Sequence, residues 1–164
     1  MFDQVFSASI KREFDSDRNG SFSEKENDKI RHGAFENLKH YGYFIFIRKG
    51  TSRLNPETVS GFRAEIINGK TLHYHFYVPV TKYGLGNDFF ISVFDRTFYC
   101  AIDLGKQPIT NSDAAEICSY KVETNKKYPI YYNPQGSPDD LTIYKSWKAG
   151  LETAYPEELH VMVK

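Results

Sequence analysis

The sequence predicts an α+β fold in which an N-terminal helix–loop–helix packs on an antiparallel β-sheet or small β-sandwich. Three observations lead to this prediction. Residues 1–41 show apolar residues at helical spacing, residues 42–123 are rich in aromatic and β-branched runs, and helices do not alternate regularly with strands. The 164 residues suffice for one hydrophobic core, so we expect a single domain over 1–164.

The first element is a pair of helices joined by a charged segment. Residues 15–26 read Asp-Ser-Asp-Arg-Asn-Gly-Ser-Phe-Ser-Glu-Lys-Glu, which matches the twelve-residue calcium loop of an EF-hand. Gly20, at loop position 6, allows the sharp turn that wraps the chain around a cation. We expect calcium as the cofactor, bound by side-chain oxygens of Asp15, Asp17 and Asn19, the backbone carbonyl of Ser21, Ser23 directly or through water, and both carboxylate oxygens of Glu26.

The flanking residues predict the two helices of this motif. Apolar residues recur at helical spacing on both sides of the loop, and Ser23 with Glu26 fits a capping box at the start of the second helix. Phe22, at loop position 8, is expected to pack onto the β-rich region or to meet a second copy of the chain. The predicted apolar faces are Phe6, Ile10 and Phe14 before the loop, and Ile30, Ala34, Leu38 and Tyr41 after it.

The second region, 42–123, predicts a series of strands. Asn68-Gly69 between two apolar runs indicates a β-hairpin with a two-residue turn. Cys100 and Cys118 fall on the apolar faces of their strands, where they either pair in an oxidising compartment or remain buried thiols. The expected strands cover 43–47, 62–67, 72–78, 88–94 and 117–123, with a further strand in which Phe98, Cys100, Ile102 and Leu104 alternate inward.

The third region, 124–164, predicts a loop, a short helix and a closing strand. Residues 124–140 are rich in Asn, Pro, Gly and Lys and read as a long loop. A short helix is expected over 139–152 around Trp147. Alternating apolar residues predict a final strand over 159–163.

Charge and hydropathy exclude two classes of partner. The chain has 21 basic and 21 acidic residues, and this zero net charge argues against nucleic acid, whose binding needs a basic excess. No apolar run approaches the length of a transmembrane helix, so direct membrane insertion is not expected. The sequence also lacks the nucleophile and dinucleotide-loop motifs of common enzyme classes, so we do not expect an enzyme.

A second candidate metal site lies in the predicted strand 72–78. His73 and His75 are two residues apart and share one face of that strand. Imidazole is a good ligand for zinc, nickel or copper, but no Cys or His cluster in the neighbouring sequence completes a ligand set. Two half-exposed strand histidines explain the pattern more simply.

Several segments together resemble a known bacterial family of unknown function, described as the periplasmic component of an uncharacterised ABC-type transport system. The resemblance covers most of 1–123 and is weaker beyond. Besides the acidic loop, it is carried by Phe2-Asp3-Gln4-Val5-Phe6-Ser7, Tyr41-Gly42-Tyr43-Phe44, Leu72-His73-Tyr74-His75-Phe76 and Val93-Phe94-Asp95-Arg96-Thr97-Phe98-Tyr99.

The resemblance implies an exported protein, periplasmic or otherwise extracytoplasmic, with a membrane transporter subunit as a partner. Genes of such proteins often adjoin or are fused to nickel/cobalt-type permeases. Members usually begin with a leader and a strand that carries a His-Pro-His segment, so we expect this sequence to be a fragment of a longer precursor. The expected function is therefore a calcium-binding accessory or binding protein of an ABC-type or metal-ion transport system, with calcium mainly structural. The alternative is a calcium-stabilised protein-interaction module without a transport role.

Overall fold

The structure of the protein, a computed structural model, has an α+β architecture. It describes residues 4–96, 102, 104, 118–124, 126–137, 140 and 142–164, and within this part of the chain the strands form three antiparallel sheets. The chain divides into two compact units. Unit 1 comprises Met1–His40 and Glu57–Pro79, and unit 2 comprises Tyr41–Pro56 and Val80–Lys164. The strand pair that joins the N-terminal helices in unit 1 therefore comes from the middle of the sequence.

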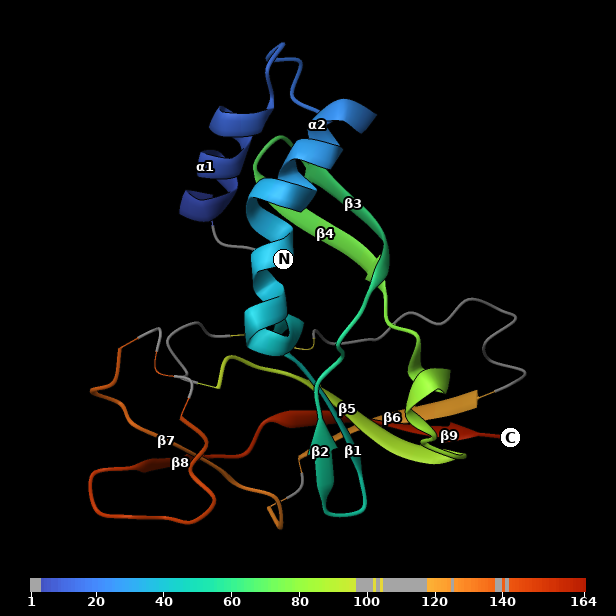
Figure 1. Cartoon of the computed structure of the whole chain (residues 1–164), viewed down its shortest axis with the longest axis vertical. Coiled ribbons are helices and arrows are strands. Elements are labelled where there is room, and N and C mark those ends of the chain that lie inside the picture. Colours follow the sequence, from blue (N-terminus) through green and yellow to red (C-terminus); the bar gives the residue numbers. More distant parts are fainter. Residues whose placement is uncertain are drawn as a thin grey trace. The chain divides into compact units, whose positions relative to one another are not determined.

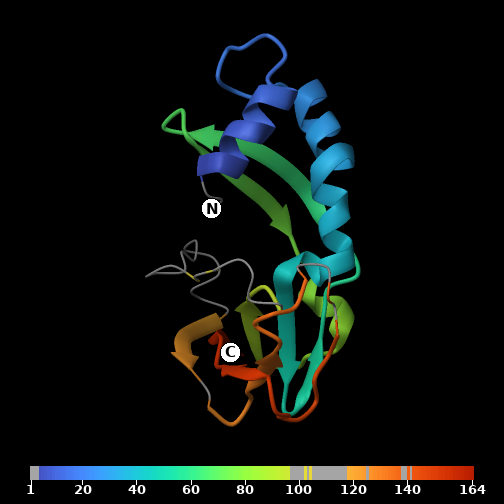
Figure 2. The same cartoon turned by 90° about the vertical axis from the view of Figure 1, so that its left-hand side faces the viewer.

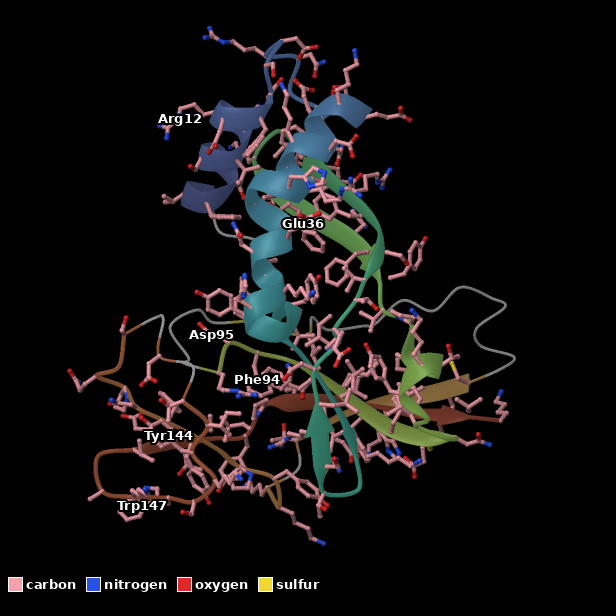
Figure 3. All side chains as sticks on the ribbon, in the orientation of Figure 1. Arg12, Glu36, Phe94, Asp95, Tyr144 and Trp147 are labelled. Carbon is pink, nitrogen blue, oxygen red and sulfur yellow. The ribbon has the colours of Figure 1, made fainter. Side chains whose placement is uncertain are left out.

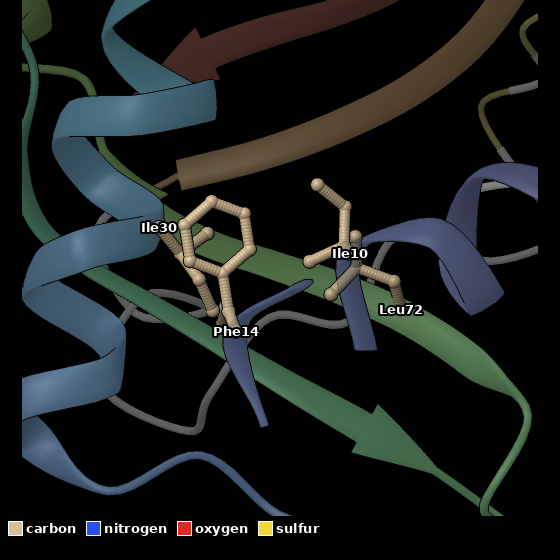
Figure 4. Close-up of a cluster of buried hydrophobic side chains, with 5 residues drawn as sticks. Ile10, Phe14, Ile30 and Leu72 are labelled. Atoms are coloured by element: carbon tan, nitrogen blue, oxygen red, sulfur yellow. The ribbon is translucent and has the colours of Figure 1, made fainter. Parts of the chain in front are cut away.

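Unit 1 consists of two helices on a two-stranded hairpin. Helix α1 (Gln4–Phe14) and helix α2 (Glu24–Ile30) lie side by side over strands β3 (Ser60–Ile67) and β4 (Thr71–Tyr77), as Figures 1 and 2 show. Their shared core is a cluster of buried apolar side chains, four of which are labelled in Figure 4. The cluster contains Ile10, Phe14, Ile30, Ala64 and Leu72, with Phe22 packed against it.

The apolar faces of the helices differ in part from the predicted ones. Ile10, Phe14 and Ile30 are buried as predicted, whereas Phe6 is 38% exposed and Ser7 takes the inner position. After α2 the helix continues as a π-helical turn, η1 (Arg31–Phe35), in which the N–H of Glu36 donates to the carbonyl of Arg31. This turn accommodates one more residue than an α-helical turn, and Phe35 rather than Ala34 becomes buried.

Polar side chains of the two helices accept hydrogen bonds from backbone N–H groups on the two outer edges of the hairpin. Ser7 of α1 accepts a hydrogen bond from the backbone N–H of Leu72 in β4 at 3.0 Å. Asn27 of α2 accepts one from the backbone N–H of Ala64 in β3 at 2.6 Å. Since Ser7, Leu72 and Ala64 are buried, these two bonds supply acceptors for donors that water reaches poorly. We call Ser7 and Asn27 the edge anchors.

The hairpin turn differs from the predicted two-residue turn. Ile67 pairs with Thr71, so three residues, Asn68, Gly69 and Lys70, lie between the paired positions. Asn68 and Gly69 have φ of 51° and 70°, and the N–H of Lys70 donates to the carbonyl of Ile67 at 3.1 Å. One additional residue in the turn shifts the pairing register by one. Each residue of β4 therefore lies opposite a different residue of β3 from the one that a two-residue turn would place there.

The 3₁₀ segment η2 (Glu36–Phe44) starts in unit 1 and ends in unit 2, and its regular helical conformation is interrupted at Gly42 and Tyr43. It leads into a five-stranded antiparallel sheet with the order β2-β1-β5-β9-β6 within the described residues. The strand predicted over 43–47 starts two residues later, because Tyr43 and Phe44 have positive φ. The strands are β1 (Ile45–Lys49), β2 (Ser52–Leu54), β5 (Asp88–Val93), β6 (Cys118–Thr124) and β9 (Glu157–Val163), and the 3₁₀ turn η3 (Val80–Tyr83) precedes β5.

A buried ion pair stabilises this sheet. Arg48 of β1 donates from Nε and Nη2 to the two carboxylate oxygens of Glu158 in β9, at 2.8 and 2.6 Å. Both side chains are only 3% exposed, and the ring centroids of Phe90 and Tyr128 lie 3.8 and 4.0 Å from the guanidinium carbon of Arg48. The pair satisfies two charges that would be costly to bury singly.

The helix predicted over 139–152 is wrong for the described residues of that range. Tyr144 instead bridges to Tyr131, and the chain then turns into β8 (Glu152–Ala154), which pairs with β7 (Ile130–Tyr132). Gly150 has φ +90°, which a helix does not allow, and the indole N–H of Trp147 donates to the carbonyl of Leu151 at 3.0 Å. Figure 3 shows Tyr144 and Trp147 beside these two strands.

Two further expectations concern residues that the structure describes only in part. Cys100, Phe98 and most of their predicted strand lie outside the described residues, so the pairing of Cys100 with Cys118 stays open. Among the described residues, no helix combines the length and the apolar character needed to cross a bilayer.

Candidate functional site: the acidic loop

The acidic loop, residues 15–26, connects α1 to α2 and closes on itself through hydrogen bonds. Asp15 directly follows α1, is buried, and accepts backbone N–H bonds from Asn19 and Gly20, each at 3.0 Å. Asp17 is exposed and accepts from the backbone and side-chain amides of Asn19 at 3.1 and 2.8 Å. These bonds curl the first half of the loop around the carboxylate of Asp15.

The turn of the loop depends on glycine at one position. Gly20 has φ +86°, a conformation that residues with a Cβ rarely adopt. It lies where the chain reverses between the first and second halves of the loop. After it, Ser21 donates from its backbone and hydroxyl to the side-chain oxygen of Asn19 at 2.8 and 2.6 Å.

Glu26 closes the loop from its C-terminal end. Its carboxylate accepts backbone N–H bonds from Ser23 at 3.0 Å and from Ser16 at 2.6 Å, and it completes the predicted capping box with Ser23. These backbone N–H donors, with the larger effect from Ser23 and the next from Ser16, lower the pKa of Glu26 to about 2. Although the residue is only 5% exposed, Glu26 is therefore ionised at neutral pH.

The loop brings three of the predicted ligands together. One carboxylate oxygen from each of Asp15, Asp17 and Glu26 lies within 4.8 Å of the others. Three negative charges at this spacing repel one another, and a cation between them removes that repulsion. Asn19, Ser21 and Ser23 lie in the same loop and bond to these carboxylates or to one another. The arrangement offers only oxygen atoms, which suits a hard divalent cation.

One residue outside the predicted ligand set connects the loop to the hairpin. The side-chain amide nitrogen of Asn27 donates to the carbonyls of Phe22 and Ser23 at 3.1 and 3.3 Å. The same side chain accepts from Ala64 of β3. Sequence reasoning missed this role, because the only local signal is an asparagine in the first turn of a helix, and its hairpin partner lies 37 residues away.

The second predicted pair, His73 and His75, lies on β4. Both point away from the helices, on the face opposite Leu72 and Tyr74, and their ring centroids are 6.2 Å apart. Their cross-strand neighbours are Glu65 and Arg63 of β3. The structure therefore places this pair and the acidic loop in the same unit, on different elements.

The fold and the site define an α+β protein with an acidic loop between two helices that pack on a hairpin. The profile of a family described as "Protein of unknown function (DUF1007)" matches residues 1–163, and the chain belongs to this family.

The chain is also similar to an uncharacterised 15.5 kDa protein from the trpE 3′ region of Spirochaeta aurantia. The two are 33% identical over 86 residues, which cover 52% of this chain and 61% of the relative. The match thus spans less than two thirds of the relative's length. No solved structure matches the chain.

Proposed function

We propose that the acidic loop binds calcium as an EF-hand and that the ion has a structural purpose. The observation that carries the proposal is the convergence of Asp15, Asp17 and Glu26, whose carboxylate oxygens lie within 4.8 Å of one another in a loop that turns at Gly20. Calcium prefers six to eight oxygen ligands in a flexible shell. The ligands would be Asp15, Asp17, Asn19, the carbonyl of Ser21, Ser23 and both oxygens of Glu26.

The structural purpose follows from what the loop connects. The last residue of α1 and the last residue of α2, Phe14 and Ile30, belong to one core together with Leu72 of the hairpin. Without a cation, the carboxylate repulsion opposes the loop conformation that brings the two helices together. Because the ion binds the folded loop, it stabilises unit 1 by mass action.

Calcium titration tests the proposal. We expect one calcium ion per chain, with a dissociation constant of about 10⁻⁴–10⁻³ M as in extracellular modules, and weaker binding of magnesium. Glu26→Gln removes a charged ligand and should abolish measurable binding. Glu24→Gln is the matched control, since Glu24 is an exposed acidic residue two positions earlier in the same helix. Equal calcium affinity in both variants would exclude the proposed ligand set.

We extend the proposal to an extracytoplasmic accessory protein of a transport system. The support is the family resemblance, and a calcium site of the expected affinity would be filled only where calcium is about millimolar. The competing role is a calcium-stabilised interaction module without a transporter. Affinity capture from detergent-solubilised membranes, in calcium and in chelator, separates the two roles. Enrichment of a permease subunit supports the accessory role, and calcium-dependent recovery of other proteins alone contradicts it.

A further inference from the structure

The outward face of the β3–β4 hairpin gathers two imidazoles and a carboxylate. Glu65 pairs directly with His73 across the strands, and His75 lies two residues further along β4. One ligand atom from each of the three side chains lies within 4.8 Å of the other two. We call these three residues the hairpin triad. It shares no residue with the acidic loop.

Direct contacts between side chains orient two of the three members of the triad. The Nε2 atom of His75 lies 2.7 Å from Oε1 of Glu65, and Nη2 of Arg63 lies 3.0 Å from the other carboxylate oxygen. A metal ion bound between the imidazole and the carboxylate would take the place of this direct contact. Arg63 would then keep Glu65 oriented from outside the coordination shell, a role that commonly tunes metal affinity.

Two other histidine–carboxylate pairs in the described residues show what distinguishes the triad. His32 lies 3.1 Å from Glu36, and His160 lies 2.6 Å from Asp88. In the part of the chain that the structure describes, neither pair is joined by a second imidazole or carboxylate that would complete a group of three ligands. Within the described residues, only the triad and the acidic loop bring three such ligand groups together.

The triad is also open on one side. A surface hollow of about 530 Å³ adjoins the triad at His75, and its other lining residues are Gly61, Arg63, Tyr74, Phe76 and Tyr77. The side chains of Glu65 and His75 are 31% and 45% exposed, so an ion can reach them and their rotamers can adjust. Three protein ligands with one open position are the arrangement of zinc sites that bind water or an exchangeable ligand.

We propose that Glu65, His73 and His75 bind a divalent transition-metal ion of the zinc and nickel class. Imidazole nitrogens favour these ions over calcium, whereas the acidic loop offers oxygen alone. Binding requires the two rings to turn towards Glu65 until each nitrogen reaches about 2.0–2.1 Å from the ion, the usual zinc–nitrogen distance. The protein would thus carry two metal sites of different selectivity.

Zinc chloride is the probe, added to the full chain in excess calcium and followed by the ring resonances of its five histidines in nuclear magnetic resonance spectra. With one equivalent of zinc, the resonances of His73 and His75 should change, and those of His32, His40 and His160 should not. An equal response of His32 or His160, or no response of the triad, would overturn the proposal.

Variants test the same inference by calorimetry. His75→Gln and Glu65→Gln should each weaken zinc binding by at least about tenfold, as expected for changes within and around a metal shell. His32→Gln is the matched control, because it removes a histidine that also contacts a carboxylate. Unchanged zinc affinity in His75→Gln would refute the triad. Glu26→Gln should abolish calcium binding and retain zinc binding, so failure of one site is distinguishable from failure of the other.

Discussion

Asn27 is the residue whose replacement tests most sharply how the acidic loop is coupled to the hairpin. In Asn27→Ala, the N–H of Ala64 loses its acceptor, and the carbonyls of Phe22 and Ser23 lose a donor. A buried donor without a partner costs about 1–3 kcal/mol. Alanine regains up to about 0.7 kcal/mol through its higher helix propensity. We therefore expect a net loss of about 0.3–2.3 kcal/mol in the free energy of unfolding.

Urea unfolding measures the loss of stability, and amide hydrogen exchange measures the local effect at the Ala64 N–H. The Leu72 N–H is an internal reference, since it bonds to the other edge anchor, Ser7, on the opposite edge of the same hairpin. Global destabilisation accelerates exchange at Ala64 and Leu72 by one common factor. Loss of the local bond accelerates Ala64 beyond that factor. Exchange of the Ala64 N–H that is accelerated no more than exchange of the Leu72 N–H would refute the coupling.

Asn37→Ala provides the matched control. Asn37 is exposed and donates only a long, 3.4 Å hydrogen bond to the carbonyl of Gly33 within the described residues. Its replacement removes the same amide group from the same helical run. We expect a change in unfolding free energy within about 0.5 kcal/mol, as for ordinary surface substitutions. A loss as large as that of Asn27→Ala would show that the hairpin contact is not the cause.

Three further variants test separate parts of the structure. Gly20→Ala should destabilise the loop by about 1–2 kcal/mol and weaken calcium binding, because Gly20 has φ +86°. A calcium affinity equal to that of the wild-type chain, measured by calorimetry, would contradict this. Leu72→Ala should cost about 2–5 kcal/mol in urea unfolding, since Leu72 is fully buried; a loss below 1 kcal/mol would argue against the shared core. Glu158→Gln should cost about 3–5 kcal/mol by leaving Arg48 buried without its counter-charge, with calcium affinity unchanged; a neutral effect would contradict the role assigned to the pair.

The acidic loop and the hairpin strands could be predicted from the sequence because their signals are local. The predicted calcium ligands all lie within twelve consecutive residues, and the alternation of apolar and polar side chains in a strand can be recognised within about seven residues. Asp15, Asp17 and Glu26 accordingly lie close together, as their spacing predicts. Calcium itself stays a prediction.

The residues that sequence reasoning missed depend on features that arise only when elements meet. Glu65 was not recognised as a partner of His73 because a two-residue turn would pair His73 with Ala64, whereas the three-residue turn pairs it with Glu65. Likewise, the π-helical turn that buries Phe35 instead of Ala34 has no simple periodic signature. The helix expected around Trp147 failed because this segment pairs with a distant one, through the bridge of Tyr144 to Tyr131 and the pairing of β8 with β7.

The melting temperature with and without calcium tests the central claim most directly. If the dissociation constant lies at 10⁻⁴–10⁻³ M, about 10 mM calcium stabilises the folded chain by about 1.4–2.7 kcal/mol relative to excess chelator. For a unit of about 60 residues, this corresponds to an increase of roughly 5–20 °C, monitored by circular dichroism at matched ionic strength. The account predicts this increase in the wild-type chain and none in Asp15→Asn. Identical melting temperatures of the wild-type chain in calcium and in chelator would contradict it.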